Sequence, residues 1–195
     1  MLYFSVRLKD FFTDTSEYLD KNFSQQKKSV HLIFSFRNYY AVMVKHTMYN
    51  AFTKVPMFEK SPLINFIREN SENKEVSALM VQEAIDYAVK EIPSFGGFIL
   101  TAQEEDKMLG AIVVNKTGLN GGNPKHRVVY LSIHDDYRQV GVGSELIKKA
   151  VHFAKGDISL RVSYESDAIE RYKSLGFQPK YVEMRLSAKD LTLNK

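Results

Sequence analysis

Residues 130–147 read YLSIHDDYRQVGVGSELI, in which an apolar strand runs through a polar turn and two glycines into an amphipathic helix. Gly141 and Gly143 carry no side chain, so an anionic group can approach the main chain closely there. The first N–H groups of the helix have no partner within it, and its positive end favours an anion. The stretch therefore predicts a phosphate-binding loop made mostly of backbone.

Three kinds of phosphate-binding loop have glycines in such a turn. A P-loop requires Gly-Lys-Ser/Thr, which does not follow here. The dinucleotide fingerprint requires a third glycine where Leu146 stands, and a first glycine directly after the strand. There remain an R-x-x-G-x-G loop at residues 138–143 and, as the alternative, a helix start with two incidental glycines.

The R-x-x-G-x-G loop is similar to the signature of the GNAT acetyltransferase superfamily. A second segment, AIERYKSLGF at residues 168–177, resembles the later helix of that superfamily, where a tyrosine follows an alanine by four positions and Gly-Phe comes next. The two motifs stand in the expected order, separated by one helix and one strand. The resemblance covers about residues 57–188. Residues 93–98, 114–118 and 180–186 look like those of an uncharacterised bacterial branch.

Hydrophobic periodicity and turn residues predict the other elements. Strands are predicted at residues 98–102, 109–115, 128–133, 158–162 and 181–186. Helices are predicted at residues 74–91, 143–154 and 166–175, with a further helix beginning at Ser61 as N-cap and Pro62 as first residue. The predicted buried face of the helix at 74–91 consists of Val76, Leu79, Met80, Ala84, Tyr87 and Ala88.

This order of elements predicts an α/β fold with a mixed sheet covered by helices. The resemblance implies the GNAT fold, whose mostly antiparallel central sheet has splayed fourth and fifth strands. The first part of the chain is predicted to contain an amphipathic helix at 7–24 and a strand hairpin at 29–36 and 39–45. We expect residues 1–55 to be an N-terminal extension packed on the sheet or part of it, residues 56–188 the acetyltransferase domain, and residues 189–195 a tail.

The resemblance also implies a binding site for acetyl-CoA as co-substrate. The pantetheine arm lies between the splayed strands, and the backbone of residues 138–144 holds the pyrophosphate. Glu165 and Ser166 stand at the positions where the family often has an asparagine, and Ser166 either contacts the pantetheine or caps the next helix. The implied cofactor-binding residues are Leu131, Ile133, Arg138, Gln139, Val140, Gly141, Val142, Gly143, Ser144 and Ser166.

Tyr172 matches the tyrosine that many members place beside the cofactor sulfur, as general acid for the leaving thiolate. Ala168, Tyr172 and Leu175 share one helical face, so a purely structural role in the core is the alternative. A free thiol titrates at about 8.5, so protonating the thiolate helps near neutral pH without being indispensable.

The general base stays open. Histone-modifying members carry a carboxylate at the start of the fourth strand, where this chain has Arg127. An alkyl amine costs about 4–5 kcal/mol to deprotonate at pH 7, whereas an aromatic or already neutral amine needs no base. The candidates near this position are His126, His134, Tyr130 acting through a water, Glu104 and Glu105.

The composition limits the class of protein. The 195 residues are 44% hydrophobic and 26% charged, which suffices for a buried core. The absence of cysteine excludes an acyl-cysteine intermediate and thiolate metal ligands. The net charge of +4 is spread along the chain, and the histidines show no ligand spacing. We expect a cytoplasmic protein with no metal and no membrane or nucleic-acid partner; a homodimer is open by analogy alone.

The leading hypothesis is an N-acetyltransferase that moves acetyl from acetyl-CoA to a primary amine by direct attack in a ternary complex. The acceptor, a small molecule or a peptide amine, is not identified. One alternative is a non-catalytic acetyl-CoA sensor, favoured by the missing carboxylate at the fourth strand and the unassigned first 55 residues. The other is a nucleic-acid-binding module, for which only the pI of about 9.0 speaks.

Overall fold

The computed structural model of the chain describes residues 44–71, 75–119, 121, 123–163, 166, 168–184 and 186–187. The chain divides into two compact units. One consists of residues 47–102 and 108–195, and the other of residues 1–46 and 103–107. The predicted helix at 7–24 and the predicted strand at 29–36 lie outside the described residues, as do residues 39–43 of the second hairpin strand.

The described strands form one five-stranded sheet in the order β1-β2-β3-β4-β5. They are β1 (Lys45–Asn50), β2 (Gly97–Glu104), β3 (Lys107–Lys116), β4 (His126–Ile133) and β5 (Ile158–Leu160). β3 and β4 are antiparallel, and β4 and β5 are parallel. A two-residue turn joins β2 to β3, which makes these two antiparallel as well. The predicted mixed, mostly antiparallel sheet is confirmed.

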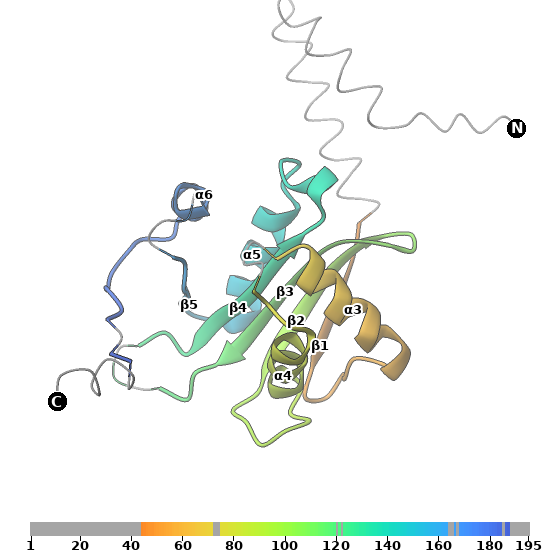
Figure 1. The fold of residues 1–195 in the computed structure, drawn as a ribbon, viewed down its shortest axis with the longest axis horizontal. Helices are drawn as coiled ribbons and strands as arrows, with labels where there is room; N and C mark the ends of the chain where they lie inside the picture. Colours follow the sequence, from red (N-terminus) through yellow and green to blue (C-terminus); the bar gives the residue numbers. More distant parts are fainter. Residues whose placement is uncertain are drawn as a thin grey trace, which may run out of the picture. The chain divides into compact units, whose positions relative to one another are not determined.

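Helices cover both faces of this sheet. They are α3 (Met57–Glu69), α4 (Ala78–Ala88), α5 (Val142–Ala154) and α6 (Ala168–Ser174), with the 3-10 turn η2 (Asp135–Tyr137) before α5. Figure 1 shows α3 and α4 on one side of the sheet and α5 on the other. Neighbouring residues of β3 agree with this: Ala111 packs in the core cluster with α3 and α4, whereas a Cβ on Gly110 would meet Val142 and Leu146 of α5.

α3 and α4 hold their place because apolar residues recur at helical spacing and are buried toward the sheet. Ser132 of β4 adds a polar link, since its Oγ donates a hydrogen bond to the Ile67 carbonyl at 3.0 Å. This bond ties α3 to the strand that carries the site described below. The buried residues of the two helices are Leu63, Ile64, Ile67, Val81, Ala84, Ile85 and Ala88.

The predicted helix start at Ser61 is wrong. α3 begins at Met57 with Pro56 as N-cap, and Pro62 lies inside the helix. An interior proline removes one helical hydrogen bond and crowds the preceding turn. The helix continues through it because the apolar residues that directly follow Pro62 are buried, and that burial outweighs the lost bond.

α4 is shorter than the predicted range of 74–91, and part of its predicted buried face is wrong. It begins after Ser77, whose side chain accepts a hydrogen bond from the Met80 N–H at 3.2 Å, and it ends at Ala88. Leu79 and Met80 are 64% and 48% exposed. The helix has apolar residues on more than one side, and the β-branched Val81 and Ile85 face the core instead.

The other predicted helices and strands within the described residues are confirmed with small shifts of their ends, apart from two. The second hairpin strand, predicted at 39–45, shares only Lys45 with β1, and the other exception lies at the C-terminal end of the chain. The strand predicted at 181–186 is wrong for the residues described there, since none of them is in a strand. Their apolar side chains are mostly exposed, with Val182 at 89% and Met184 at 91%. A strand needs a neighbour for its backbone groups, and β5 has an edge of only three residues.

Candidate functional site

β4 and β5 pair over only a short length. Within the described residues, the parallel pairing begins at His126↔Ile158 and ends at Val128↔Leu160. β4 itself continues to Ile133. The two strands therefore part where β4 runs on, which confirms the splayed fourth and fifth strands expected for this fold.

The continuing part of β4 turns backbone groups toward this opening. The N–H of His134 donates to the carbonyl of Leu109 on β3 at 2.9 Å. Backbone groups alternate between the two sides of a strand, so the N–H and C=O groups of Leu131 and Ile133 point away from β3. No strand in the described part of the chain pairs with them. This edge can therefore bind a ligand through backbone hydrogen bonds, as it would bind another strand.

A short polar turn connects β4 to α5. His134 precedes η2, and its Nδ1 accepts a hydrogen bond from the Asp136 N–H at 3.3 Å. The Arg138 guanidinium forms an ion pair with Asp135 at 2.8 Å. These contacts stabilise the turn. The chain then enters α5 at Gly141.

Gly141 is the N-cap of α5 and has a φ of 96°. This is the left-handed region, where a residue with a side chain is strained. Glycine offers no side chain to cap the helix, so the N–H groups of Val142, Gly143 and Ser144 have no partner within it. A Cβ on Gly141 would meet none of the described residues within 4 Å. An anion therefore has room to approach these N–H groups.

Gly143 has a different role from Gly141. Its backbone is not in the left-handed region, and a Cβ there would lie 3.5 Å from Ile133, an ordinary van der Waals contact. From the sequence, both glycines are expected to allow close approach of a phosphate. In the structure, that requirement rests mainly on Gly141.

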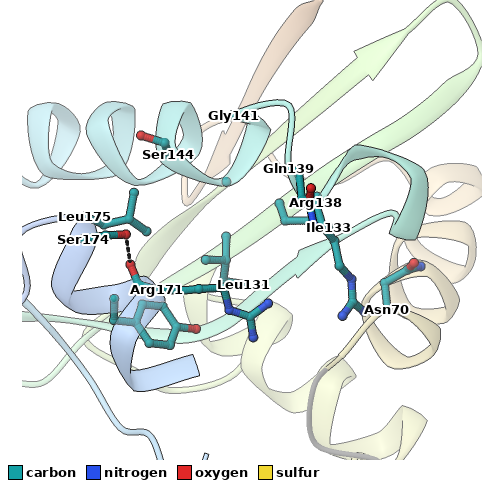
Figure 2. Close-up of a pocket in the computed structure, with 12 residues that line it drawn as sticks. Asn70, Leu131, Ile133, Arg138, Gln139, Gly141, Ser144, Arg171, Ser174 and Leu175 are labelled. Atoms are coloured by element: carbon teal, nitrogen blue, oxygen red, sulfur yellow. Dashed lines mark hydrogen bonds between the residues drawn. The ribbon is translucent and has the colours of Figure 1, made fainter. Parts of the chain in front are cut away.

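The open edge of β4, the turn and the helices α5 and α6 line a pocket of about 210 Å³, seen in Figure 2. The predicted site residues that it brings together are Leu131, Ile133, Arg138, Gln139, Gly141, Gly143, Ser144 and Tyr172. Residues of the segment 131–144 and Tyr172 of α6 thus meet at one place.

Three predicted cofactor-binding residues do not line this pocket. Val142 is 4% exposed and packs toward β3, where a Cβ on Gly110 would touch it. Val140 is 37% exposed on the turn. The Oγ of Ser166 accepts a hydrogen bond from the Ala168 N–H at 3.1 Å, so Ser166 caps the start of α6.

Four residues of the pocket were missed by the sequence argument. Arg171, Ser174 and Leu175 belong to the α6 motif that was used, but only its tyrosine was assigned a role. Asn70 is the C-cap of α3, and its Nδ2 donates to the Phe66 carbonyl at 2.9 Å. Nothing in the sequence near Asn70 signals the site, because it reaches the pocket only through the packing of α3 on β4.

Tyr172 both lines the pocket and packs against its own segment. Its ring meets Phe177 edge to face, with 5.8 Å between centroids. The Phe177 N–H also donates to the Tyr172 carbonyl at 3.0 Å, which closes the end of α6. The side chain is half-buried. Tyr172 thus both lines the pocket and packs on Phe177, and its role as general acid stays a prediction.

None of the five candidate bases is among the described pocket residues. His126 starts β4, at the end remote from Ile133, and its pKa is lowered by burial and then by the charges of Lys116 and Lys125. Tyr130 packs against the core on the α3 and α4 side, and burial followed by the charge of Glu83 raises its pKa.

The remaining three candidate bases lie in turns. His134 accepts a hydrogen bond within the turn. Glu104 and Glu105 lie at the β2–β3 turn, in the other compact unit.

Among the described residues, no group of three His, Asp or Glu side chains is placed to hold a metal ion. No described helix is long and apolar enough to cross a membrane.

The sequence profile described as "Acetyltransferase (GNAT) family" matches residues 65–177. That range contains every described residue that lines the pocket. No curated protein matches the chain.

Solved acetyltransferases share the fold at low sequence identity. A possible acetyltransferase from Clostridium difficile 630 is 14% identical, with a TM-score of 0.58 over 74% of this chain and 97% of that one. The aminoglycoside N-acetyltransferase AAC(6')-Iy, solved with CoA, is 12% identical, with a TM-score of 0.57 over 74% and 95%. An aminoglycoside acetyltransferase from an uncultured soil metagenomic sample, solved with sisomicin, is 13% identical, with a TM-score of 0.51 over 75% and 97%. At such identities the likeness concerns the fold alone.

Proposed function

The chain belongs to the GNAT acetyltransferase family, and on this premise we propose that it transfers the acetyl group of acetyl-CoA to a primary amine by direct attack in a ternary complex. The observation that carries the proposal is the pocket itself. It joins the unpaired edge of β4, the N-terminus of α5 and the side chain of Tyr172. These three features match an activated acyl donor: the helix start suits its phosphate end, the strand edge suits its amide-containing arm, and Tyr172 suits its leaving group.

The N-terminus of α5 fits the pyrophosphate of the donor. The N–H groups of Val142, Gly143 and Ser144 supply donors and the positive end of the helix. The open space at Gly141 admits a phosphate that a side chain would obstruct. Arg138, held by Asp135 beside this helix start, adds a positive charge.

The edge of β4 fits the pantetheine arm. The N–H and C=O groups of Leu131 and Ile133 face the opening between the splayed strands, so they can pair with the amides of the arm. When bound, acetyl-CoA supplies a thioester whose carbonyl carbon is open to attack by an amine. An N–H of this edge directed at the carbonyl oxygen would stabilise the charge that develops there by about 3 kcal/mol.

Tyr172 is proposed as the general acid. Tyr172 lines the same pocket as the β4 edge along which the thioester would lie. A proton donated from its hydroxyl to the departing sulfur prevents the release of a free thiolate, whose conjugate thiol titrates at about 8.5. The packing of its ring on Phe177 fixes the direction of the hydroxyl.

We propose that the acceptor enters as a small amine in its neutral form. Two of the structurally similar proteins are named as aminoglycoside acetyltransferases, so this fold accommodates small amines in those proteins. The described pocket residues include no carboxylate or histidine that would serve as a base. Deprotonation before binding, or through water, meets the requirement without one.

The pocket also favours a second candidate function, that of an acetyl-CoA sensor without catalytic activity. Two measurements separate the candidates. Melting temperatures are measured with and without acetyl-CoA, and at 100 times its dissociation constant a ligand raises the free energy of unfolding by about 2.7 kcal/mol. Release of free thiol from acetyl-CoA is then followed with a panel of primary amines.

Both candidates predict stabilisation by acetyl-CoA, and only the enzyme predicts amine-dependent release of thiol. Stabilisation without thiol release across the panel would favour the sensor. If no acyl-CoA stabilises the protein, both candidates are wrong.

A further inference from the structure

The α6 side of the pocket carries a positive charge that was not part of the sequence argument. Arg171 lines the pocket one residue before Tyr172. Figure 2 shows its guanidinium beneath Leu131, pointing into the gap that the guanidinium of Arg138 enters from the opposite side. The pocket therefore has an arginine on each of two facing walls.

The two arginines enter this gap from different elements, which meet different parts of the donor in the proposed binding mode. Arg138 belongs to the turn before α5, where the pyrophosphate is placed, and its ion pair with Asp135 keeps it in that turn. Arg171 belongs to α6 beside Tyr172, where the donor has its thioester and its amides. Those groups are neutral, so the donor offers no anion at this end of the pocket.

We propose that Arg171 binds a carboxylate of the acceptor, so that the substrate class is an amine that also carries a carboxylate rather than a polycationic amine. This inference rests on the proposed function and extends it to the acceptor. A guanidinium and a carboxylate form paired, charge-assisted hydrogen bonds with a fixed geometry. Such a pair would orient the acceptor with its amine toward the thioester.

The charge of Arg171 has a second effect on the acceptor. Pairing with Arg171 offsets the negative charge of the acceptor's carboxylate, which otherwise favours the protonated amine, and so lowers the pKa of the amine. The neutral amine is the form that attacks a thioester. Arg171 would therefore reduce the need for a general base, which agrees with the absence of one among the described pocket residues.

The test compares wild-type protein with Arg171→Gln, using amino acids each paired with its own carboxamide. The amino acids chosen carry the amine several methylene groups away from the carboxylate, so the two members of a pair have nearly the same amine pKa and differ mainly in the carboxylate. For the wild-type protein, kcat/KM for the acid should exceed that for the amide by on the order of tenfold or more. Arg171→Gln should bring this ratio close to one, and the KM for acetyl-CoA should stay within about twofold. Arg171→Lys should restore part of the preference, because it keeps the charge without the paired geometry.

Lys173→Gln is the matched control on the same helix. Lys173 pairs with Glu170 at 2.7 Å and does not line the pocket, so its removal should leave the acid-to-amide ratio unchanged. Equal loss of the ratio in both variants would assign the effect to the helix and not to the pocket, and would overturn the proposal.

Several other results overturn the proposal. Wild-type preference for the amides, or for an aminoglycoside such as kanamycin, contradicts a carboxylate-bearing acceptor. If Arg171→Gln raises the KM for acetyl-CoA about tenfold and leaves the acid-to-amide ratio intact, Arg171 serves the donor. Failure to bind acetyl-CoA at all is seen before any acceptor is added, and it removes the proposed function together with this inference.

A binding measurement covers the case in which acetyl-CoA binds and no amine of the panel is acetylated. The melting temperature of the complex with CoA is then measured with each acid and each amide. The proposal is supported if the acids raise the melting temperature, the amides do not, and Arg171→Gln removes the effect of the acids. Equal melting temperatures with acid and amide in the wild-type protein overturn it.

Discussion

At Gly141, both the backbone conformation and the proposed ligand binding require a residue without a side chain. Its φ of 96° is strained for a residue with a side chain, and the space around its missing Cβ is free of described protein atoms. Gly143, two residues later, has neither property, since its Cβ would make an ordinary contact with Ile133. Gly143 is therefore the control for a substitution at Gly141.

Gly141→Ala should lower the free energy of unfolding by about 1–2 kcal/mol, because of the left-handed backbone. It should also weaken CoA binding on the order of tenfold, since the new methyl group stands where a phosphate approaches the α5 amides. Gly143→Ala should change stability in the opposite direction, by up to about 1 kcal/mol, because alanine favours a helix. Urea unfolding and calorimetric titration with CoA measure the two effects. Undiminished CoA affinity in Gly141→Ala would contradict the assigned pyrophosphate site.

Tyr172→Phe isolates the hydroxyl from the ring, which should still pack on Phe177. If the hydroxyl protonates the leaving thiolate, kcat at pH 7 should fall by about 10–100-fold. The deficit should shrink above about pH 8.5, where the thiolate leaves without a proton. Tyr181→Phe is the control, since Tyr181 is 84% exposed and outside the pocket. A pH-rate profile parallel to that of the wild type would remove the acid assignment.

At the scale of elements, α3 shows how burial overrides a local signal. Ser61-Pro62 is a good helix start by local rules, yet the helix begins at Met57 and carries the proline inside. The proline leaves the carbonyl four residues earlier without its helical donor. The helix should therefore gain stability when an N–H is supplied at this position.

Pro62→Ala should raise the free energy of unfolding by about 1–2 kcal/mol. The restored hydrogen bond and relieved crowding exceed the entropy that the unfolded chain regains when proline is lost. Pro56→Ala is the matched control, because Pro56 is the N-cap and blocks no interior bond. Chemical denaturation of both variants gives the comparison. A stability of Pro62→Ala equal to or below that of the wild type would show that the proline costs this helix nothing.

The elements that the sequence predicts well are those with one clear apolar pattern. β2 and β3 each contain a continuous run of buried residues, and the buried residues of α5 recur at helical spacing. β1 was not predicted beyond Lys45, since only Tyr49 in KHTMYN is buried and no alternation is visible. The predicted start and buried face of α4 differ from the observed ones because its apolar residues lie on more than one side of the helix.

At the scale of the whole molecule, local motifs predicted one side of the site and tertiary packing supplied the other. The glycine loop and the Tyr172 segment are visible in the sequence because each is continuous along the chain. Asn70 enters the pocket only through the packing of α3 on β4, which the Ser132 hydrogen bond to Ile67 helps to fix. The expected domain division at residue 55 and the roles of the pocket residues stay predictions.

The parting of β4 from β5 has a consequence for the protein before it meets a ligand. The amide edge at Leu131 and Ile133 is then a short open strand edge, and such edges are sites of intermolecular β-pairing. A pantetheine arm bound there would cover the edge as a neighbouring strand does in a closed sheet. The concentration of CoA in a preparation should thus influence its colloidal stability as well as its activity, and purification without CoA should favour self-association.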